Sequence, residues 1–82
     1  MLTLADLSPG SSARVVDVLG EDGLAARIME MGIIEGELIT VVGMAPLGDP
    51  MDLEVQGYRL SLRKNEARRV TVKSDSAPSP VA

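Results

Sequence analysis

Apolar and polar residues alternate in two adjoining segments, residues 51–56 and residues 59–63. A period of two is typical of strands that bury one face. The two residues Gly57-Tyr58 between them predict a tight hairpin loop of type II′, because glycine stands first. This loop places Val55 opposite Leu60 on the buried face, so the alternation predicts an antiparallel hairpin.

Three further strands are predicted from runs rich in Val, Ile and Thr, which favour extended backbone. They cover residues 14–19, 37–44 and 69–73. In the last of these, the alternation predicts that Val70 and Val72 are buried. It leaves Thr71 and its neighbours Arg69 and Lys73 on the exposed face.

One short helix is predicted between the first two of these strands. Asp22 is a suitable N-terminal cap, and Leu24, Ile28 and Met31 recur at the spacing of one helical face. Gly32 follows where a left-handed residue commonly ends a helix. Residues 64–67 predict one further helical turn before the last strand.

These elements predict a mainly β fold: a small, partly open, five-stranded antiparallel barrel with one short inserted α-helix. A chain of 82 residues supplies one hydrophobic core at most. We expect the domain to cover residues 1–73. Residues 74–82 contain mostly Ser, Ala and Pro, and we expect them to form a disordered C-terminal tail.

The composition excludes many kinds of active site. The chain has no His and no Cys, which removes the commonest acid–base group, the thiolate nucleophile and cysteine-bound zinc. Tyr58 is its one aromatic residue, too few for base-stacking platforms. The first residues lack the basic and apolar regions of a signal peptide, and no apolar stretch approaches the roughly 20 residues of a membrane span.

Charge is distributed unevenly along the chain. Residues 1–57 hold ten acidic residues against two arginines, and residues 58–82 hold six basic residues against two acidic ones. The basic residues form a stripe over the last strands, which pairs with nearby carboxylates or, as a third functional hypothesis, binds oligonucleotides. The overall charge of -4 argues against nucleic acid, and we expect none as a partner. The stripe consists of Arg59, Arg63, Lys64, Arg68, Arg69 and Lys73.

A Pro- and Gly-rich segment, Ala45-Pro46-Leu47-Gly48-Asp49-Pro50, separates the second strand from the hairpin and predicts a rigid corner. It is followed by Tyr58-Arg59-Leu60-Ser61-Leu62-Arg63 and then by Glu66, and is preceded by Met31-Gly32. With this order and spacing, residues 2–73 resemble the FeoA family (ferrous iron transport protein A).

The resemblance implies a Src-homology-3-like barrel and a non-enzymatic accessory role in ferrous iron transport. It also implies docking on the cytoplasmic GTPase part of a FeoB-type membrane permease. The expected location is cytoplasmic, at the inner face of the membrane through that partner. The alternative is a stand-alone regulatory barrel that acts on an iron-dependent transcription repressor.

We expect no catalytic residue, no cofactor and no metal site. Asp49, Asp52 and Glu54 could offer oxygen ligands, but no histidine accompanies them, and Ser61 has no candidate base. Weak self-association through an uncovered strand edge stays open. The predicted partner-binding surface combines the helix, the corner and the start of the second hairpin strand, although core packing and backbone geometry alone also explain the helix and the corner. Its residues are Leu24, Arg27, Met31, Pro46, Leu47, Gly48, Asp49, Pro50, Tyr58 and Arg59.

Overall fold

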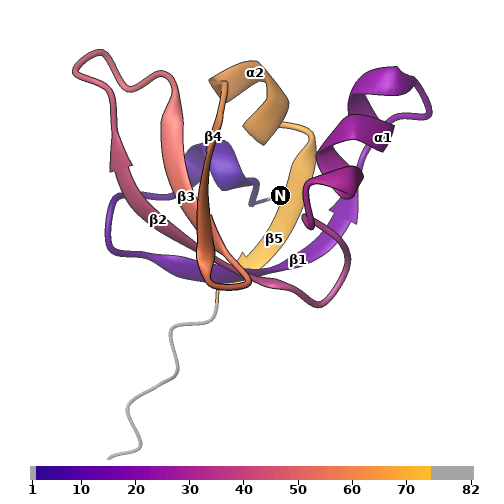
Figure 1. Ribbon diagram of the computed structural model, residues 1–82, viewed down its shortest axis with the longest axis horizontal. Coiled ribbons are helices and arrows are strands. Elements are labelled where there is room, and N and C mark those ends of the chain that lie inside the picture. Colours follow the sequence, from indigo (N-terminus) through magenta and orange to yellow (C-terminus); the bar gives the residue numbers. More distant parts are fainter. Residues whose placement is uncertain (1, 75–82) are drawn as a thin grey trace, which may run out of the picture.

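The computed structural model describes residues 2–74, and five antiparallel strands in this part form one strongly curved sheet (Figure 1). The elements are η1 (Leu4–Asp6), β1 (Ser12–Val18), α1 (Gly23–Glu30), β2 (Leu38–Met44), β3 (Met51–Val55), β4 (Tyr58–Leu62), α2 (Lys64–Ala67) and β5 (Val70–Ser74). The predicted mainly β fold with one short inserted helix is confirmed, and each strand begins and ends within two residues of its prediction.

The strands follow the order β4-β3-β2-β1-β5, so β4 and β5 are the two ends of the sheet. The sheet curls until α2, which joins β4 to β5, lies over the opening between them (Figure 1). The concave side holds a single hydrophobic core to which every strand contributes. Its fully buried larger side chains are Leu4, Ile28, Ile33, Ile39, Val41, Met51, Leu53, Val55, Leu62 and Val70.

Helix α1 begins as predicted, because the Asp22 side chain accepts a hydrogen bond from the backbone N–H of Ala25 (3.2 Å). It ends at Glu30, and Gly32 follows two residues later with a φ of 97°, in the left-handed region that commonly closes a helix. The predicted buried stripe is shifted, however. Ala25 and Ile28 are the buried residues of the helix, while Leu24 and Met31 are only partly buried beside the core. Leu24 therefore keeps exposed area that a partner could cover.

The predicted hairpin loop is wrong by one residue. Val55 pairs with Tyr58, so the loop is Gln56-Gly57 and Tyr58 is the first residue of β4. Both loop residues have positive φ (53° and 86°), which is the type I′ pattern rather than type II′. The partner of Val55 moves from Leu60 to Tyr58. Because that shift is two residues, the assignment of buried and exposed faces survives.

The exposed position predicted for Thr71 is also wrong, since this residue is buried. Leu2 and Thr3 lie along the outer edge of β5, where Thr3 pairs with Thr71 and Val72 donates its N–H to the carbonyl of Leu2 (2.9 Å). This cover accounts for the burial. Ser74 is the last residue of β5, and residues 75–82 of the predicted tail lie outside the described residues.

Candidate partner-binding surface

The corner between β2 and β3 is braced by backbone hydrogen bonds. Ala45 donates to the carbonyl of Pro50 (3.0 Å), and Gly48 donates to that of Ala45 (2.7 Å). The peptide bond between Asp49 and Pro50 is cis. At the tip of the corner, Leu47 is 96% exposed, so a large apolar side chain stands in solvent on a hydrogen-bonded turn.

Asp49 fixes the corner to the start of α2. Its Oδ1 accepts a hydrogen bond from the backbone N–H of Lys64 (3.0 Å), the first residue of that helix. The first N–H groups of a helix have no partner within the helix, so a carboxylate there satisfies one of them. The structural role proposed for the corner thus extends to Asp49, which joins two segments that lie 15 residues apart.

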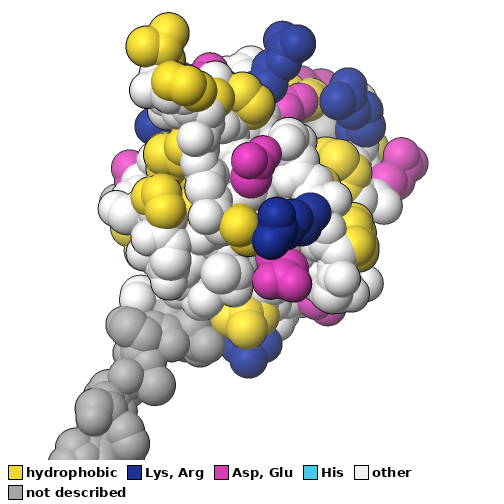
Figure 2. Space-filling view, turned by 60° about the vertical axis from the view of Figure 1, so that its left-hand side comes forward, with side chains coloured by type: hydrophobic (Ala, Val, Ile, Leu, Met, Phe, Trp, Pro, Cys, Tyr) yellow, Lys and Arg dark blue, Asp and Glu magenta, His cyan; other side chains and the backbone are white. Residues whose placement is uncertain are grey.

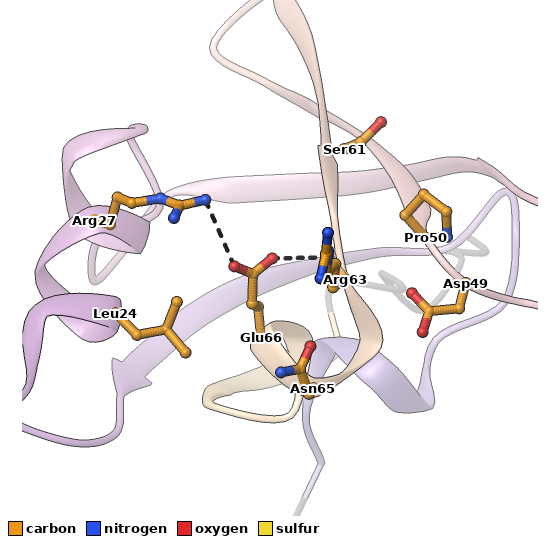
Figure 3. Close-up of a pocket in the computed structure, with 8 residues that line it drawn as sticks. All are labelled: Leu24, Arg27, Asp49, Pro50, Ser61, Arg63, Asn65 and Glu66. Atoms are coloured by element: carbon orange, nitrogen blue, oxygen red, sulfur yellow. Dashed lines mark hydrogen bonds and ion pairs between the residues drawn. The ribbon is translucent and has the colours of Figure 1, made fainter.

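Glu66 makes a second such cap at the same helix end. Its Oε1 accepts from the backbone N–H of Arg63 (2.9 Å), and its Oε2 lies 3.7 Å from Nη2 of Arg27 on α1. The glutamate side chain is 11% exposed, whereas that of Arg27 is 68% exposed. Figure 3 shows the carboxylate between the two arginines, with Arg27 reaching it from α1.

A groove of about 730 Å³ lies over this carboxylate. Helix α1 forms one side of it and the corner forms the other, with β4 and the start of α2 between them (Figure 3). It brings together four of the predicted residues, Leu24, Arg27, Asp49 and Pro50. The remaining lining residues, which were not predicted as partner-binding residues, are Ser61, Arg63, Asn65 and Glu66. The sequence analysis named Glu66 only as part of the family resemblance, although a carboxylate in the third helical position also predicts a cap.

The other predicted residues do not line this groove. Tyr58 donates its hydroxyl to the carbonyl of Met31, which fastens the start of β4 to the end of α1. A Cβ on Gly32 would come within 3.0 Å of that hydroxyl, so glycine also leaves room for the tyrosine. Arg59 stands opposite Glu54 on the exposed face of the hairpin. Pro46, Leu47 and Gly48 occupy the outer part of the corner.

The basic stripe is interrupted by an ion pair. Arg69 binds the Asp22 carboxylate with both terminal nitrogens, at 2.6 and 3.0 Å. These hydrogen bonds, joined by the one from Ala25, hold the pKa of Asp22 below its usual value of 3.8, and Asp22 in turn raises the pKa of Arg69. Arg69 is therefore committed to a structural contact. This supports the expectation that the stripe pairs with carboxylates.

Two chemistries weighed from the sequence, a metal site and a serine nucleophile, can be compared with the described part of the chain. No three acidic side chains among residues 2–74 are grouped so that they could hold a metal ion. Ser61 donates its hydroxyl to Asp52 (2.8 Å). Figure 2 shows hydrophobic and charged side chains interspersed over one face of the molecule, not gathered into one large apolar patch. No helix in residues 2–74 is long and apolar enough to cross a membrane.

Comparison with known proteins places this fold in a family. Residues 2–74 match the FeoA domain. A Porphyromonas gingivalis (strain ATCC BAA-308 / W83) protein, the Fe(2+) transport protein A/Fe(2+) transporter FeoB fusion protein, is 37% identical over 84 aligned residues. The alignment takes in 99% of this chain but only 10% of that relative, so the chain spans about one tenth of its length.

Solved structures agree with this match. A FeoA-like protein from Clostridium acetobutylicum is 38% identical, with a TM-score of 0.84 over 89% of this chain and 85% of the other. FeoA from Stenotrophomonas maltophilia, crystallised with zinc and described as a prokaryotic SH3 domain protein, is 35% identical. Its TM-score is 0.79 over 89% of this chain and 91% of the other, which confirms the predicted Src-homology-3-like barrel. The chain therefore belongs to the FeoA family.

Proposed function

We propose that this chain supports ferrous iron transport by docking on the GTPase part of a FeoB-type permease, at the cytoplasmic face of the membrane. The observation that carries the proposal is the Porphyromonas gingivalis relative, in which a region similar to this chain and a FeoB transporter belong to one polypeptide. Fusion keeps two parts close together, and separate chains need a binding surface to reach the same proximity.

The groove and the corner tip are the surface that fits this role best. The groove presents a partly exposed leucine (Leu24) and a largely exposed arginine (Arg27) beside buried polar groups, and Leu47 projects next to it. Interface centres commonly combine apolar anchors with arginine. The hydrogen bonds of the corner hold Leu47 in place before binding, which lowers the entropic cost of docking.

Docking alone can alter transport only if the barrel binds one state of the partner more tightly than another. The experiment is therefore co-purification of this chain with the soluble GTPase part of the permease, in the apo, GDP-bound and GTP-bound states. We expect retention that differs between these states. Failure to bind in all three would contradict the proposed function.

Charged variants test the surface. Leu47→Glu and Arg27→Glu change exposed side chains, so both should fold normally and lose at least tenfold in affinity, about 1.4 kcal/mol. Met29→Glu is the matched control, because Met29 is exposed on the same helix but does not line the groove. Equal binding by all three variants and the wild type would place the docking surface elsewhere.

A further inference from the structure

The pairing of β3 with β4 determines which residues of β4 direct their backbone N–H and C=O groups toward the free edge. In a two-residue hairpin the residues that flank the loop, here Val55 and Tyr58, exchange backbone hydrogen bonds with each other. Alternate residues of an antiparallel strand then direct their N–H and C=O groups to the other side. On β4 these are Arg59 and Ser61, so their backbone groups point away from β3.

This edge is short and bounded at both ends. Arg63 is next in the same phase, but its N–H already donates to Glu66. At the other end, Tyr58 is fastened to Met31 through its hydroxyl. Among residues 2–74, no backbone group and no side chain bonds to the outward groups of Arg59 or Ser61. The unpaired edge is therefore residues 59–61.

We propose that this edge pairs with the same edge of a second copy, antiparallel and about a two-fold axis at Leu60. In that register Arg59 of each copy exchanges both backbone hydrogen bonds with Ser61 of the other. The four outward groups of each strand are all satisfied, and the two sheets become continuous.

Charge selects this register over its neighbours. A shift in one direction places Arg59 opposite Arg59, and a shift in the other places it opposite Arg63, whose N–H is already bonded. Like charges in directly opposed positions are unfavourable. In the proposed register Arg59 faces Ser61, whose hydroxyl donates to Asp52 on the neighbouring strand. In that register the Arg59 side chain of each copy lies between its own Glu54 and Asp52 of the other copy.

A second copy fits this edge better than a long foreign strand. A longer strand needs further backbone groups beyond residues 59–61, and to obtain them it must displace the Glu66 cap or the Tyr58 contact. The second copy has the same three-residue length and the complementary charges. The contact is small, and we expect a dimer that forms only at high protein concentration.

Cysteine crosslinking tests the register in a chain that has no cysteine of its own. Leu60 faces itself in a non-hydrogen-bonded pair, where Cα atoms lie about 4.5 Å apart, within the range of a disulfide. We expect Leu60→Cys to form a disulfide dimer at least tenfold faster than Arg59→Cys or Ser61→Cys under the same mild oxidation. The two controls lie on the same strand but face themselves only in the shifted registers. Equal rates for all three variants overturn the proposal.

A charge exchange provides a second test that leaves Leu60 in place. Arg59→Glu and Asp52→Arg should each weaken self-association, measured by sedimentation velocity over a series of concentrations, and the double variant should restore it. Ser61→Pro should abolish association because proline removes an outward N–H, whereas Ser61→Ala keeps that N–H and should leave association largely intact. If the wild type stays monomeric at millimolar concentration, or if Ser61→Pro associates as strongly as Ser61→Ala, the edge is not a self-pairing surface.

Discussion

The molecule has two carboxylates that cap helices and meet arginines, and they do so in different ways. Asp22 caps α1 at the surface and binds Arg69 through two short hydrogen bonds. Glu66 caps α2 from a buried position and meets Arg27 at 3.7 Å. In the first pair the arginine is held firmly by an exposed carboxylate. In the second, a buried carboxylate leaves its arginine largely in solvent.

The two pairs differ in what they contribute: one contact stabilises the fold, and one arginine is left available for binding. Desolvated hydrogen-bonded groups are costly to remove, while exposed ion pairs contribute little. The cap made by Glu66 is thus the stability element at the groove, and Arg27 above it stays available to a partner. Arg69, by contrast, is already bound on both of its terminal nitrogens.

The largest effect is expected at Glu66. Glu66→Ala leaves the N–H of Arg63 without its partner at a partly buried position and should cost about 1–3 kcal/mol. Glu66→Gln keeps an acceptor oxygen and should cost less than half as much. Urea denaturation of both variants measures the difference. Equal losses would mean that the charge, and not the cap, is the important feature.

A smaller loss of stability is expected at Asp22. Asp22→Ala removes the cap and the ion pair together, whereas Asp22→Ser keeps a capping oxygen and removes only the ion pair. The melting temperatures should fall in the order wild type, Asp22→Ser, Asp22→Ala, with both above Glu66→Ala. If Asp22→Ala proves less stable than Glu66→Ala, then burial does not distinguish the two caps.

Low pH should remove the stabilisation that the ionised Asp22 carboxylate provides. The pKa of Asp22 is lowered in the folded state, chiefly by its hydrogen bond from Arg69, so the folded state favours the ionised form. The resulting stabilisation is present above the unfolded pKa of about 4 and is lost as the pH falls through the lower folded pKa. Melting curves of wild type and Asp22→Asn between pH 7 and pH 2 should converge at the acid end. A constant gap would contradict this linkage.

The smallest effect on stability is expected at Arg27. Its side chain is mostly exposed and its ion pair is long, so Arg27→Ala should change the free energy of unfolding by no more than about 0.5 kcal/mol. The same variant should still bind the GTPase part more weakly than wild type. Circular dichroism melting with a binding titration of one sample checks both, and a large loss of stability would make Arg27 a structural residue.

The sequence predicted the succession of strands and helices along the chain, the Asp22 cap of the helix, and the alternation of faces in the hairpin, because these depend on local periodicity and capping chemistry. The position of the hairpin loop was predicted wrongly because Gln56 takes a positive φ, which a sequence pattern assigns to glycine first. The burial of Thr71 was not predicted, for a different reason. It depends on residues 2–3 lying along β5, a contact that no local pattern reports.

The groove was predicted only in part. The sequence singled out Leu24, Arg27, Asp49 and Pro50, but the contacts that gather them join distant segments, such as Asp49 to Lys64 and Arg27 to Glu66. Such pairings are set by how the sheet curls, not by spacing along the chain. For the same reason Leu47 and Tyr58 were grouped with residues whose groove they do not line.

The cover that Leu2 and Thr3 place along β5 limits how copies of this chain can assemble. A sheet exposed at both ends can add molecules without limit and grow into a filament. Here Leu2 and Thr3 already occupy the β5 edge, so pairing through β4 joins two copies and adds no more. Removal of the first three residues should expose the second end and turn a self-limited assembly into open-ended polymerisation.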